Sequence, residues 1–237
     1  MNHLVVLVHG FCAGSYAVKK IEKALSELSQ ITVLLSVTNE GFEKTSDGIF
    51  PAGLRLTYEI INFVDNSNKK FTHISFIGSS LGGLLSRVAI GLLVDKNNST
   101  IISLIPVIYM SLASPHLGIL ETSYFNQYLG SIVTPNMETI NDLSLVNDTL
   151  KILSDPNAIY FFGLSLFRER YLFTNMDNDG LVNYNSGGIT NVYWDLPIVY
   201  SNVKGILTDY KDKDFILEQE DTPTLLDNMQ KLSFRRV

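Results

Sequence analysis

The chain of 237 residues contains a single cysteine, Cys12. One cysteine excludes an intramolecular disulfide and a cysteine-rich metal site. Charged residues are also scarce, at 18% of the chain against 46% hydrophobic residues, and this composition is too apolar for a disordered protein. A chain of this length can bury roughly 70% of its unfolded surface, which suits one ordinary domain with at most a small cap.

Basic residues are outnumbered, because 18 Lys and Arg stand against 24 Asp and Glu and leave a formal net charge of −6. The one basic cluster is Lys231, Arg235 and Arg236 near the C-terminus. A protein that binds nucleic acid needs a basic surface to neutralise phosphates. The composition therefore argues against a nucleic-acid partner.

Long hydrophobic runs are missing as well. The longest apolar stretch, Ile101–Ala113, is interrupted by Ser103, Pro106 and Ser111 and is far shorter than the ~20 residues of a membrane helix. The apolar segment Leu4–Val8 has no charged region before it and no cleavage site after it, unlike a signal peptide. We expect a soluble intracellular protein located in the cytoplasm, with peripheral membrane contact as a further option.

Short apolar segments alternate with amphipathic ones in the first half of the chain. The segments typical of buried strands are Leu4–Val8, Ile31–Val37, Thr72–Ile77 and part of Ile101–Ala113. The segments with helical spacing are Ser15–Leu28, a helix that begins around Pro51 with an apolar stripe of Leu54, Tyr58, Ile61 and Val64, and Leu81–Leu92. This alternation predicts an α/β fold with a mostly parallel, doubly wound sheet and helices on both of its faces.

The pattern changes between Leu117 and Glu169, where apolar residues recur at helical spacing. We expect a helical cap or lid at 117–169 within a single domain that spans 1–237. A strand resumes at Arg170–Thr174, and Leu232–Val237 resembles the start of another. The cap's apolar residues could line an acyl pocket above the sheet, contact a lipid surface, or simply pack onto the core. They are Tyr124, Phe125, Tyr128, Leu129, Ile132, Val133, Tyr160, Phe161, Phe162 and Phe167.

The segment Gly78-Ser79-Ser80-Leu81-Gly82 matches G-x-S-x-G between a predicted strand and a predicted helix. In this context the motif is typical of a nucleophile elbow, a sharp turn that exposes the central serine. Ser80 is therefore the candidate nucleophile, and the Leu81 N–H at the helix start is a candidate oxyanion donor. The alternative is a glycine-rich turn with a buried serine.

His9-Gly10 ends the first predicted strand, where an oxyanion loop would lie. We expect the backbone N–H of Phe11 to supply the second oxyanion donor. The alternative is a strand-ending turn with a packed histidine.

These segments resemble the lipase-like putative serine esterases of eukaryotes, a family of the α/β-hydrolase superfamily. The resemblance implies a serine esterase or lipase that acts on lipid esters of the acylglycerol or lysophospholipid type and needs no cofactor or metal. Ser79 and Asn183 stand where the family usually has histidine and proline. The matching segments are Leu4–Phe11, Asn39, Thr45 with Asp47–Ile49, Gly53 with Arg55-Leu56, Glu59-Ile60, Ile74–Leu84, Arg87 with Ala89-Ile90, Ala113–Gly118, and Asp179–Val182 with Ser186.

The acid of a catalytic triad is expected just after the strand at 170–174, where Asp177 and Asp179 are the candidates. The resemblance favours Asp179, which would orient an imidazole and stabilise its charged form. The alternative for either residue is a solvated turn.

The triad histidine is missing from its expected place. In this fold the order is serine, acid, histidine, but the four histidines, His3, His9, His73 and His116, all precede Asp179. The C-terminal strand or strands and the histidine loop are therefore expected to be absent. The chain could be a truncated product, a short form that has lost hydrolysis, or an enzyme that recruits His116.

The simpler expectation is that the histidines are structural: His9 orders the oxyanion loop, His116 bonds backbone in its turn and His73 is exposed.

The main prediction is an esterase that forms an acyl-enzyme on Ser80, with a lipid ester as its partner and possible contact with a membrane or lipid droplet. The alternative is a catalytically inactive lipid-binding or interaction protein on the same fold.

Overall fold

The computed structural model describes residues 2–119, 137–175, 179, 181–190 and 227–236. Its strands are β1 (His3–Val8), β2 (Ile31–Leu35), β3 (His73–Ser79), β4 (Val94–Asp95), β5 (Thr100–Ile101), β6 (Ile105–Leu112), β7 (Glu169–Phe173) and β8 (Arg235–Arg236). Its helices are the 3₁₀ helix η1 (Ser15–Val18), α1 (Lys19–Ser26), α2 (Phe42–Ser46), α3 (Ile49–Asp65), α4 (Leu81–Leu93), α6 (Glu138–Leu143), α7 (Thr149–Ser154), α8 (Ile159–Ser165) and α9 (Tyr184–Gly188).

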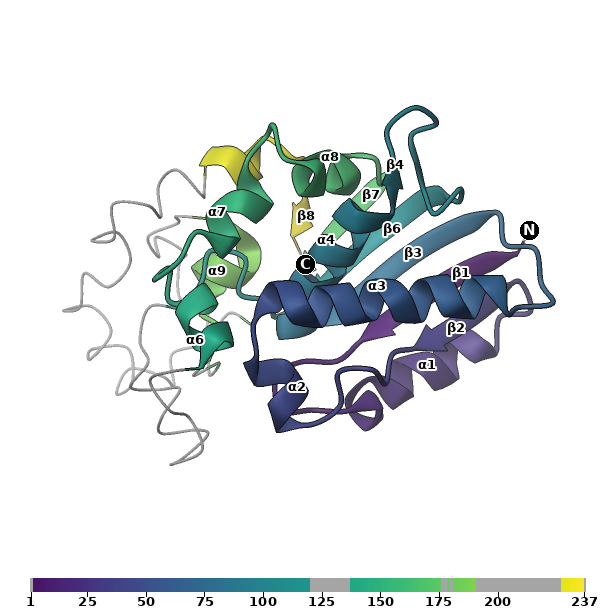
Figure 1. Ribbon diagram of the computed structural model, residues 1–237, viewed down its shortest axis with the longest axis horizontal. Helices are drawn as coiled ribbons and strands as arrows, with labels where there is room; N and C mark the ends of the chain where they lie inside the picture. Colours follow the sequence, from purple (N-terminus) through teal and green to yellow (C-terminus); the bar gives the residue numbers. More distant parts are fainter. Residues whose placement is uncertain (1, 120–136, 176–178, 180, 191–226, 237) are drawn as a thin grey trace, which may run out of the picture.

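Six strands form one sheet in the order β2-β1-β3-β6-β7-β8, and each neighbouring pair is parallel (Figure 1). The apolar, β-branched sequence of β1 suits its central place, because Leu4 to Val8 are all buried. β4 and β5 form a separate antiparallel pair. The predicted doubly wound parallel sheet is therefore confirmed, and the last predicted strand is present as β8.

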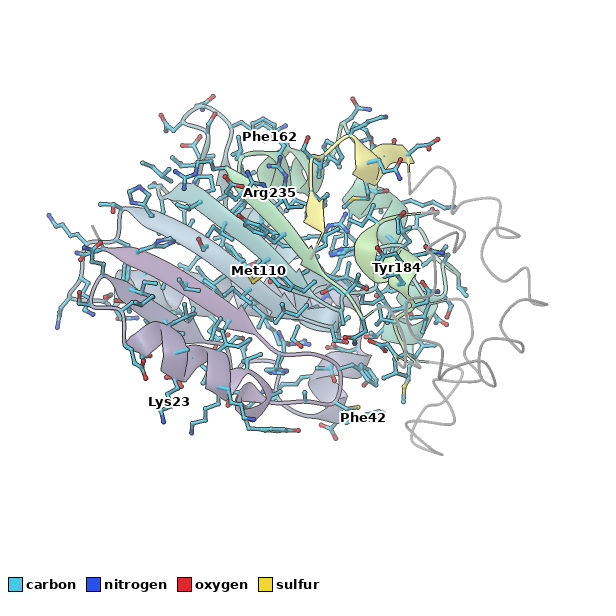
Figure 2. All side chains as sticks on the ribbon, turned by 180° about the vertical axis from the view of Figure 1, so that it is seen from behind. Lys23, Phe42, Met110, Phe162, Tyr184 and Arg235 are labelled. Carbon is cyan, nitrogen blue, oxygen red and sulfur yellow. The ribbon has the colours of Figure 1, made fainter. Side chains whose placement is uncertain are left out.

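Two hydrophobic clusters of unequal size lie on the sheet. The larger contains the inner faces of α3, α4 and α8, and in Figure 1 α3 crosses in front of the sheet. The smaller lies between β1, β2, β3 and the η1–α1 segment, with Met110 of β6 at its border. Figure 2 shows this second face, on which Met110 is labelled. Because a parallel sheet needs both faces covered, the two clusters together account for the burial of β1.

The predicted apolar stripe of α3 is wrong in part. Leu54 and Tyr58 are 43% and 58% exposed, and the buried residues are Ile49, Ala52, Gly53, Leu56, Thr57 and Ile60. The helix turns this neighbouring face inward because it packs closely on α4, where a side chain at Gly53 would overlap Val88. In α4, 12 of the 13 residues are buried, and the exception, Leu92, is 44% exposed.

Three short helices, α6, α7 and α8, fall in the range predicted as a cap, and α6 and α7 lie at the end of the sheet away from the N-terminus (Figure 1). Phe167 packs into the core against Phe76 and Tyr109, at ring distances of 6.0 and 6.3 Å. The predicted acyl-pocket residues between 124 and 133 lie outside the described residues. The division into one domain at 1–237 with a cap at 117–169 stays a prediction. In the part of the chain that the structure describes, no helix is long and apolar enough to cross a membrane.

Candidate active site

Ser80 lies at the turn between β3 and α4, with φ 52° and ψ −125°. A positive φ is rare for serine and costs about 1–3 kcal/mol, so the surroundings must enforce it. The Ser80 N–H donates to Leu112 O on β6 at 2.7 Å, and the Gly83 N–H donates to Ser80 O at 3.1 Å. These bonds fix the backbone on both sides of a half-buried side chain.

The glycines of the elbow are required by close backbone approach. A Cβ at Gly82 would overlap the carbonyl oxygen of Val8, and one at Gly78 would overlap Gly83 N. A Cβ at Gly83 would collide with the hydroxyl of Ser114. The start of α4 therefore packs closely between the ends of β1 and β6. Leu81 is the first residue of α4, and backbone N–H groups in the first turn of a helix have no intrahelical acceptor.

The loop after β1 faces Ser80 directly. A Cβ at Gly10 would lie 2.8 Å from Ser80 Cβ and 3.3 Å from Ser80 Oγ. The buried His9 ring donates from Nδ1 to Gly10 O at 3.0 Å. Since Gly10 C=O and Phe11 N–H belong to one planar peptide, this bond also sets the direction of the Phe11 N–H. His9 therefore has the ordering contact expected from the sequence, and the donor role of Phe11 remains a prediction.

Asp179 follows β7, two strands away from the strand that carries Ser80. Its Oδ1 accepts the N–H groups of Leu181 and Val182 at 3.1 and 2.9 Å, and its Oδ2 accepts Asn175 Nδ2 at 2.9 Å. The carboxylate is half-buried and held in one orientation by these donors. Asp177, the other acid candidate, lies outside the described residues. No histidine contacts Asp179 among the residues that the structure describes.

His116 is buried and does not make the side-chain bond to backbone that the sequence suggested. Its Nε2 and Ser111 Oγ are 2.9 Å apart, and its Nδ1 lies 3.4 Å from Arg87 Nη1. Burial, together with the charge of Arg87, holds the pKa of His116 well below its usual value. A neutral ring with both nitrogens engaged has none available for Ser80, so the geometry argues against recruitment of His116 as the base.

Arg87 is the largest fully buried side chain among the described residues. Burial lowers its pKa to about 10. Its Nη2 donates to Leu153 O of α7 at 2.8 Å and to Met229 Sδ at 3.1 Å. Arg87 therefore joins the nucleophile helix to the cap region and to the segment before β8. The sequence flagged Arg87 only through a family motif, because helical spacing alone cannot distinguish a buried arginine from an exposed one.

The remaining histidines, His3 and His73, lie at the amino-terminal ends of their strands, whereas Ser80 follows the carboxyl end of β3. His3 and His73 are paired at the first positions of β1 and β3, with ring centroids 6.0 Å apart. His3 Nε2 bonds Ser75 Oγ at 2.8 Å, and His73 is half-buried rather than exposed. Within the described ranges no three His, Cys, Asp or Glu side chains gather in a way that could hold a metal ion.

Comparison with known proteins identifies the family. The model of the family described as "Putative serine esterase (DUF676)" matches residues 1–191. The chain belongs to this family. Its fold is that of the α/β-hydrolases, in agreement with the prediction.

Two curated fungal relatives and one solved structure illustrate the similarity. "Putative lipase C4A8.10" of Schizosaccharomyces pombe is 28% identical over 207 residues, which cover 79% of this chain and 26% of the relative. "Putative lipase ROG1" of Saccharomyces cerevisiae is 31% identical over 195 residues, which cover 76% and 27%. The chain thus spans about a quarter of the length of these relatives. Phospholipase PlaB from Legionella pneumophila shares the fold, with a TM-score of 0.50 at 15% identity over 78% of this chain and 43% of that chain.

Three of the motif residues without an assigned role make contacts that hold the fold together. Arg55 binds both carboxylate oxygens of Asp47 at 2.7 Å and donates to Asn39 Oδ1 at 2.8 Å. Ser186 accepts the Leu117 N–H and donates to Gly118 O, which ties α9 to the turn after β6. Asn183, at the usual proline position, caps α9 by accepting the Ser186 N–H at 2.8 Å.

Proposed function

We propose that the protein is a serine esterase that hydrolyses carboxylic esters of lipids through an acyl-enzyme on Ser80. The observation that carries the proposal is the strained backbone of Ser80, enforced by the ends of β1 and β6 and placed against the Gly10 loop. Strain of this kind is typically retained where it serves a reaction. Membership of the esterase family supports the same reaction class.

The proposed reaction has two halves. Ser80 Oγ attacks the ester carbonyl carbon while its proton passes to a base, and the carbonyl oxygen becomes an oxyanion. The N–H groups of Leu81 and Phe11 donate to this oxyanion. The alcohol then leaves with the proton, an acyl group remains on Ser80, and attack by water releases the carboxylic acid and restores the serine.

No described side chain is an obvious base for accepting the Ser80 proton. Asp179 is proposed to orient an imidazole, but no histidine follows it in the sequence. Among the described histidines, His116 bonds Ser111 and Arg87 through its two ring nitrogens, whereas His9 bonds Gly10 O through Nδ1 and its buried Nε2 has no partner. A triad without its base retains only the catalysis of the oxyanion hole and of binding, ~10³–10⁴ over water.

Added imidazole tests the proposal on the chain as it is. Hydrolysis of p-nitrophenyl esters with short and long acyl chains is measured for the wild type and for Ser80→Ala, with and without imidazole. We expect imidazole to increase the Ser80-dependent rate by about tenfold or more, because it supplies the missing proton acceptor. A fluorophosphonate should label the wild type at Ser80. Equal rates and equal labelling in the two proteins would refute the esterase proposal.

A lipid-binding or interaction protein without turnover is the second candidate. It is favoured by the contacts of His116, whose two ring nitrogens are engaged by Ser111 and Arg87. This candidate predicts that a fluorescent fatty-acyl ligand binds while no Ser80-dependent hydrolysis occurs, with or without imidazole.

The substrate class and the cellular location belong to the proposal as well. We propose acylglycerols or lysophospholipids as substrates, which a comparison of turnover on monoacylglycerol and lysophosphatidylcholine would separate. We also propose a cytoplasmic protein that contacts membranes or lipid droplets peripherally, where such esters are found. Imaging of a fluorescent fusion together with membrane and lipid-droplet stains tests the location.

A further inference from the structure

The loop that carries Phe11 is held by α2 as well as by His9. The Cys12 N–H donates to Thr45 Oγ1 at 3.0 Å, and the Gly41 N–H donates to Ala13 O at 3.1 Å. The rings of Phe11 and Phe42 meet edge to face, with centroids 6.1 Å apart. Three successive residues of the loop therefore contact α2 or its N-cap residue Gly41.

Thr45 makes the central one of these three contacts and is fully buried. Its hydroxyl hydrogen is directed to Gly41 O at 2.8 Å, which leaves an oxygen lone pair for the Cys12 N–H. Cys12 has φ 53°, a conformation that a non-glycine residue rarely keeps without outside support. Because Cys12 directly follows Phe11, the bond to Thr45 restrains the peptide next to the proposed oxyanion donor.

The same residue also contacts the cap region. The Thr139 hydroxyl of α6 donates to the backbone oxygen of Thr45 at 2.7 Å and accepts the Gly48 N–H at 2.9 Å. α2 and α6 lie side by side in Figure 1. A hydrogen-bonded path thus runs from α6 through Thr45 to the loop that faces Ser80.

We propose that Thr45 is a positioning residue for the oxyanion hole and couples that hole to the docking of α6. This inference rests on the proposed esterase function. The Thr45 side chain fixes the loop through Cys12, while the Thr45 backbone receives the contact from α6. The two links are chemically separate, so they can be removed one at a time.

The first experiment removes the Thr45 hydroxyl. Thr45→Val keeps the shape of the side chain but cannot accept the Cys12 N–H, whereas Thr45→Ser can. In the imidazole-supported assay we expect Thr45→Val to lower kcat by about tenfold to a hundredfold with KM changed less than about threefold, because misplacing a donor affects the transition state. Thr45→Ser should restore kcat to within about threefold of the wild type. A rise in KM without a fall in kcat, or a Thr45→Ser variant that does not recover kcat, would overturn the inference.

The matched control is Thr57→Val. Thr57 is also buried in a helix and its hydroxyl also donates to the carbonyl four residues earlier, Gly53 O, at 2.9 Å. It accepts no bond from the oxyanion loop. Its replacement should leave kcat unchanged, and a drop equal to that of Thr45→Val would show that the effect is merely structural.

Amide hydrogen exchange gives a readout that does not need activity. Exchange at Cys12 should accelerate by about tenfold or more in Thr45→Val and stay unchanged in Thr57→Val. Thr139→Val removes both bonds of the Thr139 hydroxyl, to Thr45 O and from the Gly48 N–H, but leaves the Thr45 hydroxyl in place. Faster exchange at Cys12 in this variant would demonstrate the coupling, and unchanged exchange would refute it. If Ser80→Ala hydrolyses esters as fast as the wild type, the esterase proposal fails, while the exchange data still decide whether Thr45 holds the loop.

Discussion

Ser80 can keep its strained conformation only if the residue facing it has no side chain. Gly10 is that residue, since its Cβ would lie 2.8 Å from Ser80 Cβ. Gly10→Ala should therefore displace the nucleophile, lower fluorophosphonate labelling of Ser80 by about tenfold or more, and cost about 1–3 kcal/mol of stability from overpacking. Labelling kinetics and urea denaturation measure both effects.

Gly188→Ala is the control for this prediction. A Cβ there would meet its nearest neighbours at 3.5 Å, an ordinary contact. Labelling should stay at the wild-type level, and equal losses in the two variants would mean that Gly10 has no special relation to Ser80.

His116 should make the protein less stable in mild acid. Its pKa is lowered by burial and by Arg87, so below about pH 6.5 the unfolded chain binds a proton that the native state does not. The free energy of unfolding should therefore fall as pH decreases from 6.5, with a slope of up to about 1.4 kcal/mol per pH unit from this one group. Urea denaturation at several pH values between 5 and 7.5 checks the slope.

His116→Gln should flatten this pH dependence, whatever its effect on stability at pH 7.5. His3→Gln should flatten it less, because His3 is only half-buried, although burial lowers its pKa in the same direction. An unchanged slope in His116→Gln would show that the ring binds protons equally in the native and unfolded states, so that its pKa is not shifted by folding.

At the scale of residues, the turn at Ser80 could be predicted from the sequence more reliably than the contacts of His116. The G-x-S-x-G motif determines a local backbone shape, so it can be recognised without knowing the rest of the fold. The contacts of His116 include Arg87 of α4, 29 residues earlier, as well as the nearby Ser111. Partners that are distant in sequence leave no local pattern, and the role of Arg87 was missed for that reason.

At the scale of elements, α3 shows why apolar spacing can select the wrong face. Its buried face includes Ala52, Gly53 and Thr57, small residues that a hydrophobic stripe does not count. They are inside because α3 and α4 approach closely, and Gly53 is adjacent to Val88. Large apolar residues such as Leu54 and Tyr58 are left outside. The existence of the helix was predictable, but its rotation depended on its packing partner.

The docking of α6 depends on a buried carboxylate. Asp142 Oδ2 accepts the Ile49 N–H at the start of α3 at 2.7 Å, and its Oδ1 accepts Thr149 Oγ1 and Asn147 Nδ2 at 2.6 and 2.7 Å. Asp142→Asn places an amide among these donors and should cost about 2–3 kcal/mol in urea denaturation. Asp148→Asn is the control, because Asp148 is an exposed partner of Lys151 and should change stability by less than about 0.5 kcal/mol. Equal effects would show that Asp142 is not the anchor.

At the scale of the whole molecule, strand order and handedness together decide which face of the sheet each helix covers. Right-handed crossovers place α3 and α4 on one face as the chain moves across β1, β3 and β6, and place α1 on the other as it moves to β2. A mostly parallel sheet with helices on both faces could be predicted from the sequence. The unequal size of the two hydrophobic clusters could not, because it depends on how many helices each face receives.

This inequality predicts that the two faces differ in stability. α1 has no fully buried residue and contributes only Ile21 and Leu25, partly buried, to the smaller cluster, whereas α4 lies almost wholly inside the larger one. Native-state hydrogen exchange should therefore show α1 opening at a lower free energy than α4. Ala24→Gly, at an exposed site in α1, should lower the opening free energy of α1 by about 1 kcal/mol. The amides of α4 should keep their protection if α1 opens alone, and an equal change in both helices would mean that the two faces unfold as one unit.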